Sequence, residues 1–192
     1  MLELLTQTFN ASVVAVTQLL LSTVVTTNPW FDDLQITFSG MKQEIVCSTK
    51  LSTSFTETLD DVLLSGENIT LHFKFDLYEV EQNEVVHSHE VVNGFRFDPD
   101  DEIYYLYDSE TQKVDRFFTI EAAKDTYISV NNLDLITVDE LDPGAEYFLQ
   151  VSAYLDPIKM ENVTESVNLM LRWASVKPTI VSENFRVSER QT

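Results

Sequence analysis

The sequence has few of the residues that most catalytic and metal-binding motifs require. It contains one cysteine, three histidines and four glycines. A single cysteine excludes an internal disulfide and a cysteine-based zinc framework, and so few glycines leave little material for phosphate-binding loops. Nucleophile-elbow, phosphate-loop, zinc-protease and dinucleotide-binding motifs are all absent. The sequence therefore predicts a protein that is not an enzyme and that carries no cofactor.

Basic residues are also scarce. The chain has 12 lysines and arginines against 32 aspartates and glutamates, a formal net charge of -20. Nucleic-acid binding depends on basic side chains that displace counterions, so a nucleic-acid partner is disfavoured, and anionic membrane surfaces would repel the chain. The acidic excess favours solubility, a basic partner or cation binding. We expect the partner to be another protein.

Residues 1–28 form an apolar segment that differs from the rest of the chain. The stretch from Ala11 to Thr27 is interrupted by polar residues and is short for a membrane-spanning helix. The first basic residue is Lys42, so the basic region that opens a secretory signal is missing. We interpret the segment as an atypical targeting or anchor remnant, or as a packed element. Membrane association is expected only through this segment, and residues 29–192 are predicted to form a single β-rich domain.

From Pro29 onward, apolar and polar residues mostly alternate, which is typical of half-buried strands. Short strands with turns between them argue for a sandwich rather than alternating βαβ units. The strands are expected at 34–38, 42–51, 71–77, 85–92, 102–108, 114–119, 136–138, 145–155, 163–173 and 179–187.

Two short helices are predicted among these strands. The first begins with Ser54 and Glu57, a capping-box pair, and continues with apolar residues on one face. Gly66 stands where a C-terminal cap is expected. The second helix is expected to begin after Thr119.

The single cysteine, Cys47, lies within an alternating stretch and has no histidine close to it in sequence. A catalytic thiol requires a nearby base or cation that lowers its pKa. We therefore interpret Cys47 as a small buried apolar residue.

Two sets of residues are candidate metal ligands. If Gln82 and Asn83 form a two-residue turn, strand pairing places four potential ligands of zinc, nickel or copper on one sheet face: His72, Asp76, His87 and His89. The second set is an acidic loop whose oxygens could bind calcium: Asp98, Asp100, Asp101 and Glu102. The first set is explained equally well by polar residues that face solvent. The second set lacks the glycine and the spacing of an EF-hand, so an ordinary acidic turn explains it as well.

A tyrosine-rich strand gives a hint of an interaction surface. Tyr105 and Tyr107 are expected on one face, and Tyr104 and Leu106 on the other. One face must therefore be exposed or covered by a partner, for which aromatic side chains are suitable anchors.

The segment from Leu141 to Tyr147, with Pro143 and Gly144 between them, resembles the corner between the fifth and sixth strands of fibronectin type III domains. In such sandwiches a tyrosine hydroxyl bonds back to the upstream backbone. Tyr147 would have that structural role, with Leu141 buried beneath it. The fold expected is a mostly β, immunoglobulin-like (fibronectin type III-like) sandwich with one or two short helices.

A longer resemblance extends from about Leu34 to Trp173 and includes the tyrosine strand from Ile103 to Asp108. It is similar to a bacterial family of usually exported proteins of comparable length, catalogued as a domain of unknown function. The resemblance implies a periplasmic or cell-envelope location. The unusual N-terminus keeps a cytoplasmic location as the alternative.

Together these features predict a non-catalytic protein-binding or assembly module of the bacterial envelope. A metal-binding protein that uses the histidine face or the acidic loop is one alternative. A hydrolase with convergent carboxylates is another, because sequence cannot show which carboxylates converge.

Overall fold

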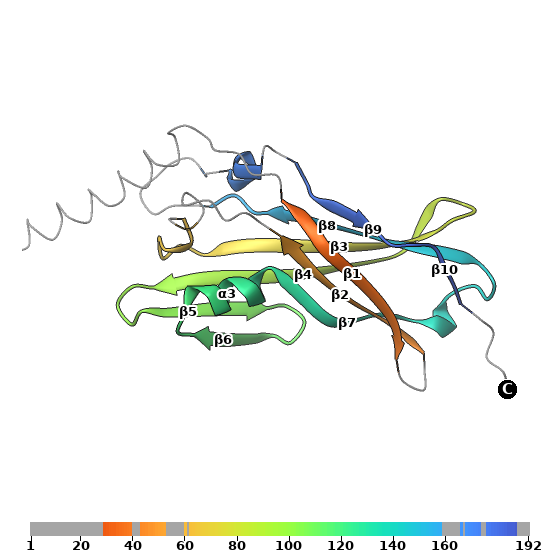
Figure 1. Cartoon of the computed structure of the whole chain (residues 1–192), viewed down its shortest axis with the longest axis horizontal. Helices are drawn as coiled ribbons and strands as arrows, with labels where there is room; N and C mark the ends of the chain where they lie inside the picture. The colour runs from red at the N-terminus through yellow and green to blue at the C-terminus, as the bar shows by residue number, and fades with distance from the viewer. Residues whose placement is uncertain are drawn as a thin grey trace, which may run out of the picture.

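The chain is mostly β-structure in the computed structural model, which describes residues 29–39, 43–52, 60, 62–158, 166, 168–173 and 176–187. These residues form two sheets and one complete α-helix (Figure 1). The expected N-terminal segment, residues 1–28, and the Ser54–Glu57 capping box lie outside the described residues.

The smaller sheet has three antiparallel strands in the order β1-β2-β7. Their bounds are Trp30–Ser39, Glu44–Ser52 and Ser129–Thr137. The larger sheet has the order β10-β8-β3-β4-β5-β6, and β9 also pairs with β8. Its strands, from β3 to β6 and from β8 to β10, are Ile69–Glu79, Glu84–Asp98, Ile103–Asp108, Lys113–Phe117, Glu146–Leu155, Thr179–Val181 and Phe185–Arg186.

The core lies between the two sheets, where the apolar residues of each alternating strand meet. In β3, Leu71, Phe73 and Leu77 are at most 1% exposed. Phe31 of β1 packs against Phe73 from the other sheet, with ring centroids 6.3 Å apart. Alternation places these side chains on one face of each strand, so the two sheets form the sandwich that the sequence predicts.

Helix α3, Ile120–Tyr127, connects the larger sheet to the smaller one. The Thr119 hydroxyl accepts a hydrogen bond from the Ala122 backbone N–H, which caps the helix where the sequence predicts. Ala123 and Tyr127 are buried, and the helix packs against β5 and β6. Of the first predicted helix, Asp60, Val62 and Leu63 are described and helical. Gly66 follows them with a φ of +83°, as expected for a C-terminal cap.

Several predicted boundaries are wrong. Strand β4 continues six residues beyond the predicted end, and β7 begins at Ser129 rather than Ile136. Residues Leu169–Trp173 form a 3-10 helix, η2, where a strand was expected, and Leu169 and Trp173 are buried. The last predicted strand is divided into β9 and β10. A second 3-10 helix, η1, spans Val138–Glu140.

Candidate functional site

The predicted histidine face does not form. The β3–β4 register shifts between Leu77 and Tyr78, so that Val86 is an extra residue and His87 lies opposite Leu77. His89 lies opposite Phe75, on the core-facing side. A one-residue bulge transfers the following side chains to the other face. His87 and His89 therefore lie on the opposite face from His72 and Asp76.

The four predicted ligands instead belong to separate polar contacts. His72 stacks on Tyr154 at 4.4 Å, with Nδ1 3.4 Å from Glu90 and Nε2 3.1 Å from Asp156. The buried Asp76 carboxylate accepts hydrogen bonds from the Ser88 hydroxyl at 2.7 Å and from the Lys74 ammonium at 2.8 Å. The His89 ring contacts Glu110 at 3.0 Å, and His87 stacks on His89.

The acidic loop is a turn stabilised by its own first residue. The Asp98 carboxylate accepts hydrogen bonds from the backbone N–H groups of Asp100, at 3.1 Å, and Asp101, at 3.4 Å. Glu102 has a φ of +55° and directly precedes β5. Within the described part of the chain, no three histidine, cysteine, aspartate or glutamate side chains are placed to hold a metal ion.

Cys47 is fully buried in β2, as expected. Burial raises the pKa of its thiol to about 12, and the nearby negative charge of Asp134 adds to the effect. The thiol donates a weak hydrogen bond to the Leu133 carbonyl at 3.8 Å. A thiol that stays protonated in this way is a core residue rather than a nucleophile.

A cleft of about 350 Å³ opens between the two sheets, beside β7. It exists because β4 and β5 extend past the edge of the smaller sheet, in which β7 is the last strand. The floor of the cleft is apolar and largely buried. It consists of Val91, Leu106, Val130 and Leu133.

Four carboxylates stand around this floor: Asp108, Glu110, Asp115 and Asp134. They come from the end of β5, the β5–β6 turn, β6 and β7, respectively. Within the described residues, no hydrogen bond or ion pair engages the carboxylate of Asp115 or of Asp134. The cleft therefore combines an apolar floor with an acidic rim, and sequence reasoning missed it because no local pattern links these segments.

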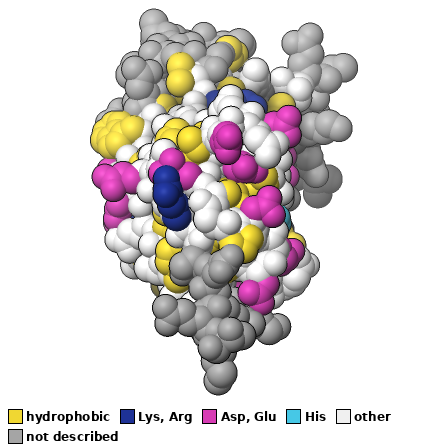
Figure 2. Space-filling view, turned by 90° about the vertical axis from the view of Figure 1, so that its right-hand side faces the viewer, with side chains coloured by type: hydrophobic (Ala, Val, Ile, Leu, Met, Phe, Trp, Pro, Cys, Tyr) yellow, Lys and Arg dark blue, Asp and Glu magenta, His cyan; other side chains and the backbone are white. Residues whose placement is uncertain are grey.

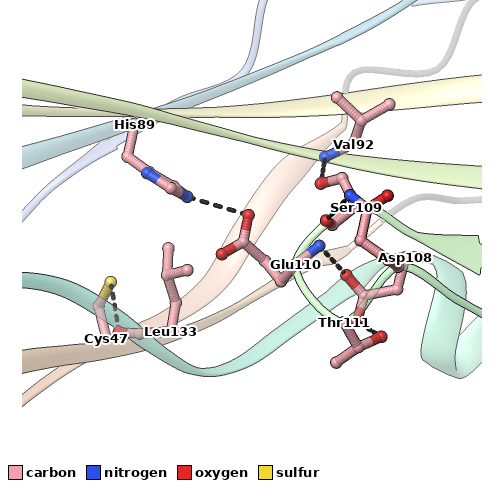
Figure 3. Close-up of polar contacts among 9 residues, drawn as sticks. Cys47, His89, Val92, Asp108, Ser109, Glu110, Thr111 and Leu133 are labelled. Atoms are coloured by element: carbon pink, nitrogen blue, oxygen red, sulfur yellow. Dashed lines mark hydrogen bonds and ion pairs between the residues drawn. The ribbon is translucent and has the colours of Figure 1, made fainter.

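Hydrogen bonds fix the β5–β6 turn at the rim of the cleft and connect it to β4 (Figure 3). The Asp108 carboxylate accepts from the Glu110 backbone N–H at 2.8 Å and from the Thr111 hydroxyl at 3.2 Å. The Ser109 hydroxyl accepts from the Val92 backbone N–H at 2.8 Å, which ties the turn to β4. Glu110 also contacts His89, so the carboxylates of both Asp108 and Glu110 have partners on neighbouring residues or strands.

The opposite face of β4–β6 carries the predicted tyrosine surface. Tyr105 lies between two guanidinium groups, with Arg96 at 5.4 Å and Arg116 at 5.6 Å from its ring centroid. Tyr107, on the same face, is 37% exposed. Leu106 points the other way and is buried, so the expected division of this strand into two faces is confirmed.

Acidic side chains are prominent beyond the cleft as well. Figure 2 shows one end of the molecule, where acidic side chains outnumber basic ones and surround exposed apolar residues. The exposed aromatic Phe38 stacks edge-on against Phe185 at the end of β1.

Tyr147, at the start of β8, is buried and bonds to the upstream backbone, as expected. Its hydroxyl accepts a hydrogen bond from the Asp142 N–H at 2.9 Å and lies 3.2 Å from the Asp142 carbonyl, to which it donates. Leu141 is buried beneath the turn. Pro143 is exposed, and Gly144 has a φ of +83°, a conformation that other residues rarely adopt.

Comparison with known families gives one match. The family model for a domain of unknown function, DUF4390, matches residues 32–166, which is more than half of the chain. The chain belongs to this family. Members of DUF4390 are bacterial, so the bacterial resemblance seen in the sequence is confirmed.

Other comparisons add no relative to the DUF4390 assignment. Searches of the curated proteins and of the solved structures gave no significant match. No helix among the described residues is long and apolar enough to cross a membrane.

Proposed function

We propose that this chain is a non-catalytic protein-binding or assembly module of the bacterial cell envelope, and that its inter-sheet cleft binds a basic segment of the partner. The observation that carries this proposal is the apolar floor beneath a rim of carboxylates. A lysine or arginine side chain can lay its methylene groups on such a floor while its charged end reaches the rim. The net charge of -20 would also accelerate encounter with a basic partner.

The architecture that we assign is an immunoglobulin-like sandwich of the fibronectin type III kind. The strand order supports this assignment, because β8 lies between β3 and the C-terminal strands while β1, β2 and β7 form the other sheet. The hydrogen bonds between Tyr147 and Asp142 also support it, since they match those of a tyrosine corner. Such sandwiches host many functions, so the binding role rests on the cleft rather than on the fold.

The non-catalytic role is supported by the state of the reactive side chains. Burial raises the pKa of Cys47 and keeps its thiol protonated. His72 lies on the outer face of the large sheet, and the His89 ring contacts Glu110. The thiol of Cys47 has its hydrogen bond with the Leu133 carbonyl and not with a histidine. The envelope location is supported by the similarity to usually exported bacterial proteins.

Partner capture tests the role of the cleft. The full-length protein would be immobilised and exposed to an envelope extract of the native organism, in parallel with Asp134→Lys and Glu81→Lys variants. Glu81 is an exposed residue of the β3–β4 turn, outside the cleft, and its substitution changes the net charge by the same amount. We expect a basic protein to be retained by the wild type and by Glu81→Lys but lost by Asp134→Lys.

Other results would contradict the proposal. Equal loss with both variants would show attraction by overall charge alone, and retention by Asp134→Lys would place the binding surface elsewhere. If no partner is captured by the folded wild-type protein, the binding role itself fails.

A further inference from the structure

Strand β6 ends the larger sheet with an unpaired edge. It pairs with β5 on one side, and within the described residues no strand pairs with the other side. Figure 1 shows β6 at the border of the sheet, with α3 beside β5. Four of its five residues are exposed. Such an edge presents free backbone N–H and C=O groups that can pair with another strand.

We propose that this edge binds β6 of a second copy, antiparallel and centred on Val114, so that the large sheets of two molecules join into one. In this register the two Val114 residues face each other, and Lys113 of each copy lies opposite Asp115 of the other. The proposal goes beyond the binding function of the cleft and does not depend on it.

Unpartnered charges select this register. Within the described residues, neither the Lys113 ammonium nor the Asp115 carboxylate has a hydrogen bond or ion pair. Centring the pair on Asp115, on Lys113 or on Arg116 would place two like charges directly opposite each other, which destabilises a sheet. The Val114 register gives two opposite-charge pairs and keeps all the paired residues from Lys113 to Asp115 inside β6.

The same register completes an apolar row on the outer face. Val114 is 58% exposed and lies opposite Tyr107, which is 37% exposed. Tyr107 in turn lies opposite Gly94, where an added Cβ would come within 3.3 Å of the tyrosine Cβ. In the pair, the Val114 and Tyr107 side chains of the two copies form one continuous row, and cross-strand pairs of this kind stabilise a sheet.

Charge also explains why the pair should be weak at low salt. Each copy has a net charge of -20, so two copies repel each other over long distances. At physiological ionic strength, repulsion between exposed charges is screened beyond about 8 Å. The two contacts between Lys113 and Asp115 are shorter than this screening length in a paired sheet, where opposite Cβ atoms are about 5 Å apart.

Sedimentation velocity across a series of protein concentrations, in physiological salt, tests the pairing. We expect a monomer–dimer equilibrium for the full chain. Lys113→Glu or Asp115→Lys should weaken it about tenfold, because each change places like charges opposite each other twice. The double variant K113E/D115K should restore the dimer. A monomer at every concentration, or a dimer that is unaffected by the single variants, would overturn the proposal.

Disulfide trapping provides a second measurement that does not depend on charge. Facing residues of antiparallel strands have Cα atoms about 4.5–5.5 Å apart, within the range that a disulfide can bridge. Val114→Cys should therefore form a covalent dimer on mild oxidation. The matched control is Val85→Cys, which is 46% exposed on the β3–β4 hairpin and should stay monomeric. The native Cys47 is buried and gives no background.

The two proposals can fail separately. Asp134→Lys, which tests the cleft, lies on β7 and should leave the dimer intact. Equal trapping of both cysteine variants would overturn the strand pairing and leave the cleft proposal standing. Failure of the wild-type protein to capture a partner would overturn the cleft proposal and leave the strand pairing standing.

Discussion

The central strands of the large sheet, β3 and β8, differ from its peripheral strands, β5 and β6. The central strands contribute most of the core residues of the large sheet, whereas only Leu106 of β5 is buried and no residue of β6 is. The small sheet packs on the centre, as the contact of Phe31 with Phe73 shows, whereas among the described elements α3 packs against β5 and β6. The centre therefore supplies most of the buried apolar surface of this sheet, and the periphery supplies the cleft and an edge that no described strand pairs with.

A core deletion tests the strength of the centre. Phe73→Ala in β3 removes a ring with 0% exposure that packs against Phe31. The free energy of unfolding should fall by about 3–5 kcal/mol. Val114→Ala in β6 is the control and should change it by less than about 0.5 kcal/mol. Urea unfolding of both variants measures the difference, and comparable losses would mean that the periphery is as well packed as the centre.

The corner that leads into β8 is expected to matter less than the core. Tyr147→Phe removes both hydrogen bonds between the tyrosine hydroxyl and the Asp142 backbone, which are part-buried. We expect a loss of about 1–3 kcal/mol in unfolding free energy. Tyr107→Phe removes only a 3.3 Å contact from the exposed hydroxyl to Gln112 and should be nearly neutral. A neutral Tyr147→Phe variant would argue against the tyrosine-corner assignment.

Alkaline pH tests how completely the core covers Cys47 of the small sheet. Burial raises the thiol pKa in the folded protein to about 12, from a value of 9.0 for an unperturbed cysteine. The thiol therefore loses its proton at a lower pH in the unfolded chain than in the folded protein. The contribution of Cys47 to stability is complete below the pKa of the unfolded chain and declines as the pH rises toward the pKa of the folded protein.

The slope in this window should be about 1.4 kcal/mol per pH unit. The unfolding free energies of the wild type and of Cys47→Ala would be measured at about pH 8 and about pH 10. The difference between their two pH dependences is the contribution of Cys47, because all other groups titrate in both proteins. Parallel pH dependence of the two proteins would mean that the thiol is accessible in the folded state.

The smallest effect is expected at the periphery. Thr119→Ala removes the cap of α3, in which the Thr119 hydroxyl accepts from the Ala122 N–H at 3.4 Å. We expect a loss of about 0.5–1 kcal/mol. Hydrogen exchange should accelerate in α3 and in the neighbouring β6 but not in β3. Uniform acceleration would show that the two regions unfold as one unit.

The strand pattern of the centre could be predicted from the sequence, because alternation is a local property. Leu71, Phe73 and Leu77 alternate with polar residues, and all three are buried in β3. The cap at Thr119 and the bond from Tyr147 to the upstream backbone were also recognisable, since each involves residues that are close in sequence.

The predicted histidine face does not form because of one residue. The bulge at Val86 leaves the apolar pattern of β4 intact but reverses the faces of His87 and His89. Similarly, the 3-10 helix at Leu169–Trp173 has the apolar content of a strand, and its Leu169 and Trp173 side chains are buried.

The sequence by itself determined the acidic charge, the absence of catalytic motifs, the alternating strands and the family. Only the tertiary structure decided which side chains meet. Asp115 and Asp134 converge on one cleft because β5 and β6 extend past β7. That arrangement depends on strand register and on which strand ends each sheet, and both follow from pairing between segments that are distant in the chain.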